Sequence, residues 1–321
     1  MRTHVPYVRF TVLICFLTLF SIKVHSQSLL LKNGKFEVGV GVGPMFFLGD
    51  LGGTQGVGQT FLKDLNLPLT KISKGIYFNY YPKEWLGFRV AGNLGYVEGD
   101  DAQAPAKGGD EEDRKYRNLS FQSVINEAYA AFEIYPTVFF EKSDDLKGKF
   151  RPYLLAGAGI YHFNPKTHDS SGRLVALHPL RLEGEGFAEY PDSKPYSLTQ
   201  MNLLMGFGFK YYIKENLYIG FEILHRKLFT DYVDDVSHRY YIDPIYFSKY
   251  LSPADAAEAR QLYFRGTYNQ YWNSSRPWSQ IAQRGDPSQN DAYFSSILRL
   301  GWRINAEGNL HKKQLKCPVF Y

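Results

Sequence analysis

The stretch FEVGVGVGPMFF, residues 36–47, alternates between apolar side chains and small or charged ones. In an extended chain its valines fall on one face, and Glu37 and the glycines fall on the other. A period of two residues indicates a β-strand with one apolar face. A phosphate-binding glycine loop is excluded, because Pro44 stands where G-x-G-x-x-G requires its last glycine and the alternation does not give way to a helix.

Seven further segments repeat this alternation, so the sequence predicts eight strands. The other seven are residues 74–82, 86–97, 119–135, 150–163, 198–212, 217–229 and 292–304. Long polar connections (50–73, 98–118, 164–197 and 230–291) alternate with shorter ones (82–85, 136–149 and 213–216). This rhythm is typical of an outer-membrane barrel with long extracellular loops and short periplasmic turns. We therefore predict an all-β fold, an eight-stranded antiparallel up-and-down transmembrane β-barrel with both termini in the periplasm.

The start of the chain predicts export. Arg2 and Arg9 precede an uncharged run over 10–22, which is too short for the roughly 20 apolar residues of a membrane helix. This layout is typical of a secretory signal peptide, cleaved near Ser26. Cys15 could instead be a lipoprotein acylation site, but the residue before it, an isoleucine, is larger than such a site requires. The predicted organisation is a signal peptide over 1–26, a barrel over 27–305 and a periplasmic tail over 306–321.

Composition excludes two other classes of protein. The mean hydropathy is −0.32 and no second long apolar run occurs, which excludes a helical membrane protein. The net charge is only +5 and the basic residues are scattered, so no nucleic-acid partner is predicted.

Aromatic residues gather at both ends of the predicted strands. Those beside the short turns are Tyr80, Tyr81, Trp85, Phe150, Tyr153, Tyr211, Tyr212, Tyr218 and Trp302, and those at the opposite ends are Phe46, Phe47, Tyr96, Tyr161, Phe163 and Phe229. Two aromatic girdles indicate two membrane interfaces, so outer-membrane lipids are expected to surround the barrel. A soluble, tyrosine-rich β-sandwich is the alternative, but it requires neither the two rims nor the long-short rhythm.

Charged residues alternate with the apolar ones and are expected to face the barrel interior. They are Arg89, Glu127, Glu133, Glu222, Arg226, Arg299 and Arg303. The interior of an eight-stranded barrel is just wide enough for side chains, so these charges are expected to pair and to block a water channel. We expect Arg89, Arg299 and Arg303 to face the three glutamates, and we do not expect a porin.

The sequence predicts no catalytic, cofactor or metal site, and so no enzyme. Asp100, Asp101 and the acidic run 110–113 could hold calcium, but basic residues interrupt them and a solvated loop is favoured. His162 and His225 could form an acid–base pair, but no spaced Ser/His/Asp set accompanies them.

The longest predicted loop, 230–291, is expected to contain a short helix. Ser252 and Pro253 provide an N-cap and a first-turn proline before an alanine-rich segment. The loop could be a lid over the barrel mouth, and its Trp272 and Trp278 could also bind a partner or a glycan.

Several stretches together resemble one family. They are LGDLGG at 48–53, FLKDLNLP at 61–68, GDD at 99–101, RNLSFQS at 117–123, LFTDYVDDVS at 228–237 and KCPVFY at 316–321. With the order of the strands, they resemble the PorG-like outer-membrane barrels of Bacteroidota, a family associated with the type IX secretion system. The motif residues are Gly49, Asp50, Asp231, Tyr232, Asp234 and Asp235. The last strand departs from the family pattern, because it is less aromatic.

The resemblance implies a non-enzymatic component that links the outer membrane to a periplasmic ring of a PorK-like lipoprotein and a PorN-like protein. Through that ring it would support protein secretion and, in some relatives, gliding motility. The rival hypothesis is a stand-alone surface barrel, OmpA-like in its membrane part, for adhesion or envelope integrity.

The tail holds Cys317, the one cysteine that remains after removal of the signal peptide. An odd cysteine in an oxidising compartment indicates either intermolecular pairing or a free thiol. An idle thiol on a frayed terminus is the simpler reading. We predict instead a disulfide with a periplasmic partner, for which the resemblance suggests the PorK-like lipoprotein.

Overall fold

The computed structural model describes residues 35–51, 70–103, 117–141, 145–266 and 283–304. Within these ranges the dominant feature is a set of eight long strands. They are β1 (Phe36–Leu48), β2 (Lys71–Lys83), β3 (Leu86–Asp100), β4 (Ser120–Ile134), β5 (Phe150–His162), β8 (Thr199–Tyr212), β9 (Leu217–Leu228) and β10 (Ala292–Ile304). Each strand pairs antiparallel with its neighbours, so each segment predicted from the two-residue period forms a strand.

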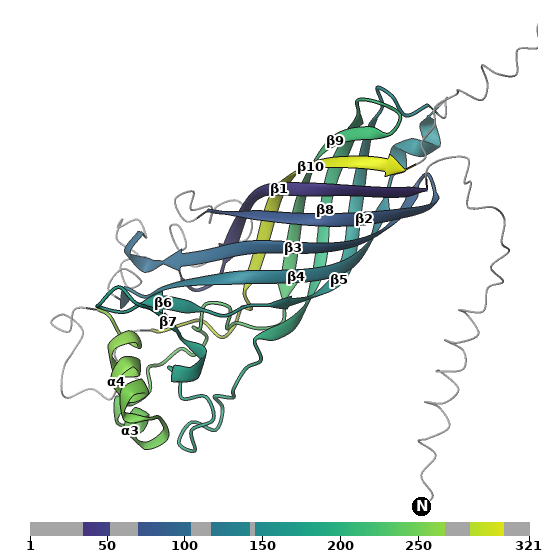
Figure 1. Ribbon diagram of the computed structural model, residues 1–321. Coiled ribbons are helices and arrows are strands. Elements are labelled where there is room, and N and C mark those ends of the chain that lie inside the picture. The colour runs from purple at the N-terminus through teal and green to yellow at the C-terminus, as the bar shows by residue number, and fades with distance from the viewer. Residues whose placement is uncertain (1–34, 52–69, 104–116, 142–144, 267–282, 305–321) are drawn as a thin grey trace, which may run out of the picture.

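The sheet closes on itself as a barrel (Figure 1). The first strand pairs with the last, from Phe36 opposite Ile304 to Leu48 opposite Ala292. The pairing of β3 with β4 completes the ring between the two halves. The predicted fold, a closed eight-stranded antiparallel barrel, is therefore confirmed.

Smaller elements lie in the connections. The connection after β5 contains the hairpin β6 (Lys166–His168) and β7 (Leu174–Ala176), and the one after β9 contains helices α3 (Phe247–Tyr250) and α4 (Pro253–Leu262). Short 3-10 helices are η2 (Asp101–Gln103), η3 (Pro136–Phe140), η4 (His178–Leu180) and η5 (Pro244–Tyr246). The α4 helix begins where its capping residues predict, since the Ser252 hydroxyl accepts the amide of Asp255 at 3.2 Å. No helix in the described ranges is both long and apolar enough to cross a membrane.

The long connections fold over one end of the barrel as a compact cap, formed by residues 49–51, 101–103, 117–119, 163–198, 229–266 and 283–291 (Figure 1). We call this end the capped end and the other the short-turn end. Side chains from α3, α4 and η4 share one buried apolar cluster with strand residues such as Ile125 and Tyr293. The connection 164–197 is therefore not only a polar loop, because it buries Leu177, Leu180 and Leu182 in that cluster.

Alternation along the strands separates two faces. Outward apolar side chains are open to the surroundings, with Val40 53%, Ile76 68%, Val90 60% and Leu298 64% exposed. Inward positions on the same strands are buried and hold most of the charge, including Arg89, which is 1% exposed. This is the reverse of a water-soluble barrel, whose apolar side chains would be inside.

The predicted aromatic girdles need correction. Tyr80, Trp85, Phe150, Tyr211 and Trp302 are exposed outside the short-turn end as predicted. Tyr81, Tyr153, Tyr212 and Tyr218 are instead buried inside the barrel, and Tyr161 and Phe163 are buried at the capped end. The reason is the two-residue period, which sends neighbours such as Tyr80 and Tyr81 to opposite faces.

The adjacent pair Tyr80 and Tyr81 offers a test of this assignment. The Tyr81 hydroxyl donates to Glu37 Oε2 at 2.9 Å and accepts from Lys210 Nζ at 2.6 Å. Tyr81→Phe leaves buried polar atoms unsatisfied and should lower the free energy of unfolding by about 1–3 kcal/mol. Tyr80→Phe should change it by less than about 0.5 kcal/mol, because its ring lies outside. Urea unfolding of the barrel in phospholipid vesicles measures both, and equal effects would contradict the assignment.

Candidate functional site

The barrel interior holds a column of buried ion pairs. Nearest the short-turn end, Lys210 Nζ lies 2.7 Å from Glu37 Oε1 and 3.5 Å from Glu133 Oε2. The Tyr218 hydroxyl also donates to Glu37 Oε1, at 2.5 Å. A lysine with no exposed side-chain surface is thus held by two carboxylates and surrounded by tyrosine rings, of which Tyr218 is the nearest, 4.6 Å from Nζ to ring centroid.

In the middle layer, two arginines pair with one carboxylate. Glu222 lies between Arg89 and Arg299, with its two oxygens each 2.5 Å from a guanidinium nitrogen. Arg89 also pairs with Glu133, which joins this layer to the one below. The Tyr153 hydroxyl donates to Glu222 Oε2 at 2.6 Å, so the carboxylate is satisfied on both oxygens.

Glu127 organises the layer nearest the cap. Arg226 Nη2 lies 3.1 Å from Glu127 Oε2, and Asn93 donates to the same oxygen at 2.9 Å. Asn202 and Tyr293 donate to the other oxygen at 2.8 and 3.0 Å. Because every one of these side chains comes from a different strand, the charges cross-link the barrel wall from the inside.

The predicted interior residues therefore separate into two groups. The structure brings Arg89, Glu127, Glu133, Glu222, Arg226 and Arg299 together in this column. Arg303 also faces the interior, but its expected pairing with one of the three strand glutamates is wrong. It lies near the end of β10, where the turn residue Glu84 reaches it at 2.6 Å, and the three strand glutamates are paired elsewhere.

Sequence reasoning missed three interior charges. Glu37 and Lys210 complete the column, and Arg151 shares Glu84 with Arg303, 2.8 Å from Arg151 Nη1 to Glu84 Oε2. All three stand at inward positions of strands that were identified, so the alternation contains the signal that finds them.

The family-like motif residues lie at the capped end. Asp234 accepts the amide of Leu51 at 3.1 Å and that of Val236 at 3.0 Å. Asp50 accepts the amide of Asp286 at 2.8 Å. The loop after β1 is thereby tied both to the loop after β9 and to the segment before β10.

The remaining motif residues complete this part of the cap. Asp235 has a positive φ of 63° and accepts the Tyr196 hydroxyl at 2.5 Å, while Tyr232 stacks on the Tyr196 ring with centroids 4.5 Å apart. Asp231 is buried. A Cβ at Gly49 would lie 2.3 Å from Asp291 Oδ1, so this close approach requires glycine.

Two buried arginines hold the cap loops together. Arg117 pairs with Asp101 at 2.8 Å and donates to the carbonyl of Asp50 at 2.7 Å. Arg284 pairs with Glu183 at 2.8 Å and donates to the carbonyl of Asp235 at 3.1 Å. Arg117 also donates to the carbonyl of Arg284, which links the two groups.

The sequence also suggested a calcium-binding loop, a histidine pair and functional residues in the long loop and the tail. Asp101 is not part of a solvated loop, because it is fully buried against Arg117, and 110–113 lies outside the described residues. His162 on β5 and His225 on β9 are separated by β8, and His162 Nδ1 lies 3.0 Å from Thr199 Oγ1. Trp272, Trp278 and Cys317 also lie outside the described residues. Within the described part of the chain, no group of three or more His, Cys, Asp or Glu side chains could hold a metal ion.

Comparison with known proteins finds resemblance only at the level of structure. No protein-family model matches the chain. No curated protein matches it.

Among solved structures, OprG from Pseudomonas aeruginosa is 11% identical with a TM-score of 0.37, over 85% of this chain and 97% of that one. Outer Membrane Protein W of E. coli is 12% identical with a TM-score of 0.34, over 85% and 99%. Neisserial surface protein A is 10% identical with a TM-score of 0.35, over 84% and 97%. Similarity this remote carries no conclusion about the function of this chain.

Glu222→Gln tests the column. The substitution keeps the volume of the side chain but leaves Arg299 without a carboxylate inside the barrel, which should cost about 3–5 kcal/mol of unfolding free energy. Glu98→Gln is the matched control, because Glu98 pairs with the half-exposed Lys71 and should cost at most about 1 kcal/mol. Urea unfolding in lipid vesicles compares them. A Glu222 variant as stable as the Glu98 variant would show that the column contributes little.

The cap should loosen as pH rises. Burial raises the pKa of Asp50 to about 6, that of Asp235 to about 7 and that of Asp231 to about 9. Raised carboxyl pKa values favour the protonated folded state, so their stabilisation is complete below the ordinary value near 3.8 and is lost as pH rises through these values.

Hydrogen exchange of amides in 230–237, corrected for the intrinsic pH dependence of exchange, should therefore show less protection at pH 9 than at pH 5. Asp235→Asn should remove the part of this change that arises below about pH 7, the raised pKa of Asp235. Asparagine retains the acceptor for Tyr196 and tolerates the positive φ. Protection that increases with pH would refute the assignment.

Proposed function

We propose that this protein is a non-enzymatic outer-membrane barrel of the type IX secretion system. In this role it links the membrane to a periplasmic ring that contains a PorK-like lipoprotein and a PorN-like protein. One observation carries the proposal: four separate stretches that resemble the family are bonded to one another in the cap. Leu51 is bound to Asp234, and Arg117 is bound to both Asp50 and Asp101. The resemblance therefore coincides with one folded unit.

The outward face supports a membrane location. A closed barrel satisfies all backbone hydrogen bonds between strands, as hydrocarbon requires. Its outward apolar side chains, such as Val90 and Leu298, are exposed along the strands. Contact with water would be unfavourable for so much apolar surface, whereas contact with lipid tails is not.

The two ends support an orientation. Phe36 and Ile304 are paired at the short-turn end, so β1 begins and β10 ends there. In the proposed role this end faces the periplasm, where the ring lies, and the cap faces outward. Because the interior is crossed by ion pairs, the barrel would act as a fixed anchor and not as a passage for cargo.

A stand-alone surface barrel for adhesion or envelope integrity is the second candidate. The cap favours it in one respect, because Leu174, Tyr240 and Ile245 expose apolar surface on a rigid scaffold. Such residues suit a binding surface outside the cell.

Deletion of the gene separates the two functions. Loss of the proposed anchor should abolish extracellular release of proteins with the type IX C-terminal signal, and the wild-type gene should restore it. Extracellular cargo is measured by mass spectrometry of culture supernatants, with a cytoplasmic protein as the lysis control. Normal secretion with altered adhesion would reject the anchor and support the surface barrel.

Cys317 provides a second readout in the same strains. The proposed disulfide to the PorK-like lipoprotein should give a higher-mass band on a non-reducing gel of cell envelopes. Reductant and Cys317→Ser should both remove it. Absence of the band, with normal secretion by the serine variant, would reject the covalent link without rejecting the anchor.

A further inference from the structure

Lys74 is an exposed cation on the outward face of the barrel. Its neighbours on that face of β2, Ile72 and Ile76, are 66% and 68% exposed. Lys74 is the fourth residue of β2 and lies within the paired part of the strand, opposite Val42 and Leu94. Within the described residues, no hydrogen bond or ion pair satisfies its ammonium group. A cation among lipid-facing side chains is costly, so it requires an anionic partner or water.

Three more polar side chains extend the cross-strand row that begins at Lys74. Leu94 lies opposite Asn126, Asn126 opposite His162, and His162 opposite Thr199. Asn126, His162 and Thr199 are all exposed on the outward face. The row therefore places a cation on β2 and hydrogen-bonding groups on β4, β5 and β8, with Leu94 of β3 between them.

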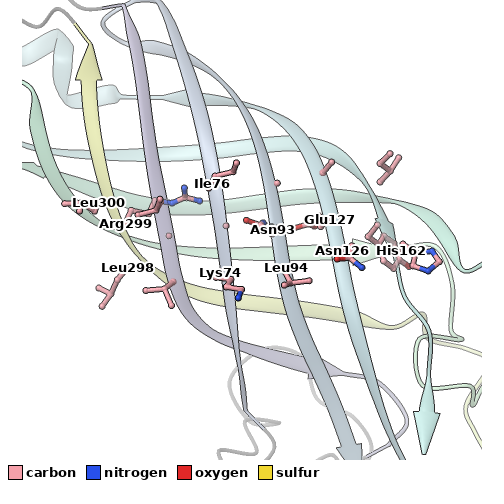
Figure 2. Close-up of a pocket in the computed structure, with 18 of the residues that line it drawn as sticks. Lys74, Ile76, Asn93, Leu94, Asn126, Glu127, His162, Leu298, Arg299 and Leu300 are labelled. Atoms are coloured by element: carbon pink, nitrogen blue, oxygen red, sulfur yellow. Dashed lines mark hydrogen bonds between the residues drawn. The ribbon is translucent and has the colours of Figure 1, made fainter. Parts of the chain in front are cut away.

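The row borders a hollow of about 1010 Å³ in the barrel surface (Figure 2). Figure 2 shows Lys74, Leu94, Asn126 and His162 on adjacent strands along it. On the outward face the remaining wall is mostly apolar and includes Val40, Val42, Ile76, Leu298 and Leu300. Asn93, Glu127 and Arg299 also line the hollow, from the inward side of the wall, where Glu127 is paired with Arg226 and Arg299 with Glu222. The outward face of this site, with one cation, a few hydrogen-bonding groups and apolar walls, is amphipathic, as a lipid is.

We propose that this hollow binds one phosphate-bearing lipid of the surrounding membrane. The lipid phosphate pairs with the Lys74 ammonium, and Asn126 and His162 hydrogen-bond oxygens of the headgroup or of the ester region. The acyl chains lie along Val40, Ile76, Leu298 and Leu300. Lysine suits this role because its ammonium is a compact point charge on a flexible apolar stem. The inference rests on the membrane location in the proposed function, but not on the secretion role.

Native mass spectrometry of the full-length protein in a neutral detergent tests the site. The probes are phosphatidic acid and phosphatidylcholine with identical acyl chains. Wild-type protein should retain phosphatidic acid preferentially. Lys74→Gln should weaken that binding about fivefold, the effect of one lysine near an anionic lipid surface, and Lys74→Arg should keep most of it. Lys227→Gln is the matched control, because Lys227 is exposed on the outward face of β9 and does not line the hollow.

Each arm has an outcome that overturns the proposal. Equal retention of the two lipids by wild-type protein would show that the phosphate is not recognised, and this arm needs no variant. Equal losses for Lys74→Gln and Lys227→Gln would show a general charge effect. Complete displacement of phosphatidic acid by equimolar inorganic phosphate would show an ion site without acyl recognition. Secretion by the Lys74→Gln strain is measured separately, so failure of the lipid site does not decide the anchor function.

Discussion

Closure of the sheet by the pairing of β1 with β10 is the constraint on which the other features depend. Hydrogen bonds run from Phe36 opposite Ile304 to Leu48 opposite Ala292, and no strand of the ring is left with an open edge. Once the ring is closed, every strand residue faces either the interior or the surroundings. The inward charges are then enclosed at a fixed radius, and each of them needs a partner across the lumen.

In the lumen, most charges of the ion-pair column form one connected network of ion pairs instead of isolated pairs. Glu133 connects Lys210 with Arg89, and Glu222 connects Arg89 with Arg299. Large rings fill the space between these charges, and glycines on the neighbouring, paired strands make room for them. A Cβ at Gly301 would lie 2.3 Å from the Tyr218 ring, so a larger residue there would displace the tyrosine that donates to Glu37. The buried charges therefore depend on the tyrosine rings that bind them, and the rings depend on the glycines that leave space for them.

The cap depends on the barrel in a different way. Its loops come from separate parts of the chain, and the strands bring their ends to one rim. There, a shared apolar cluster and the Arg117 and Arg284 networks join them. The acidic residues of TDYVDDVS serve mainly as acceptors for backbone amides and for Tyr196, which explains how several carboxyl groups are tolerated in a buried place. On this view the motif maintains the fold of the cap, and any partner would contact the surface that it supports.

The sequence by itself determined the strands, their number and the side of each that is apolar, because a period of two residues is local and needs no knowledge of neighbours. It also identified most members of the ion-pair column, such as Glu222 and Arg226. It did not identify which acidic residue pairs with which basic one. Arg303 meets Glu84 because register and turn geometry bring them together, and Lys210 meets Glu37 across 173 positions of sequence. The tertiary structure alone decided how four remote loops form one cap and that Lys74 shares a row with Asn126 and His162. These features depend on strand register and closure, which are properties of the assembled sheet and not of any one segment.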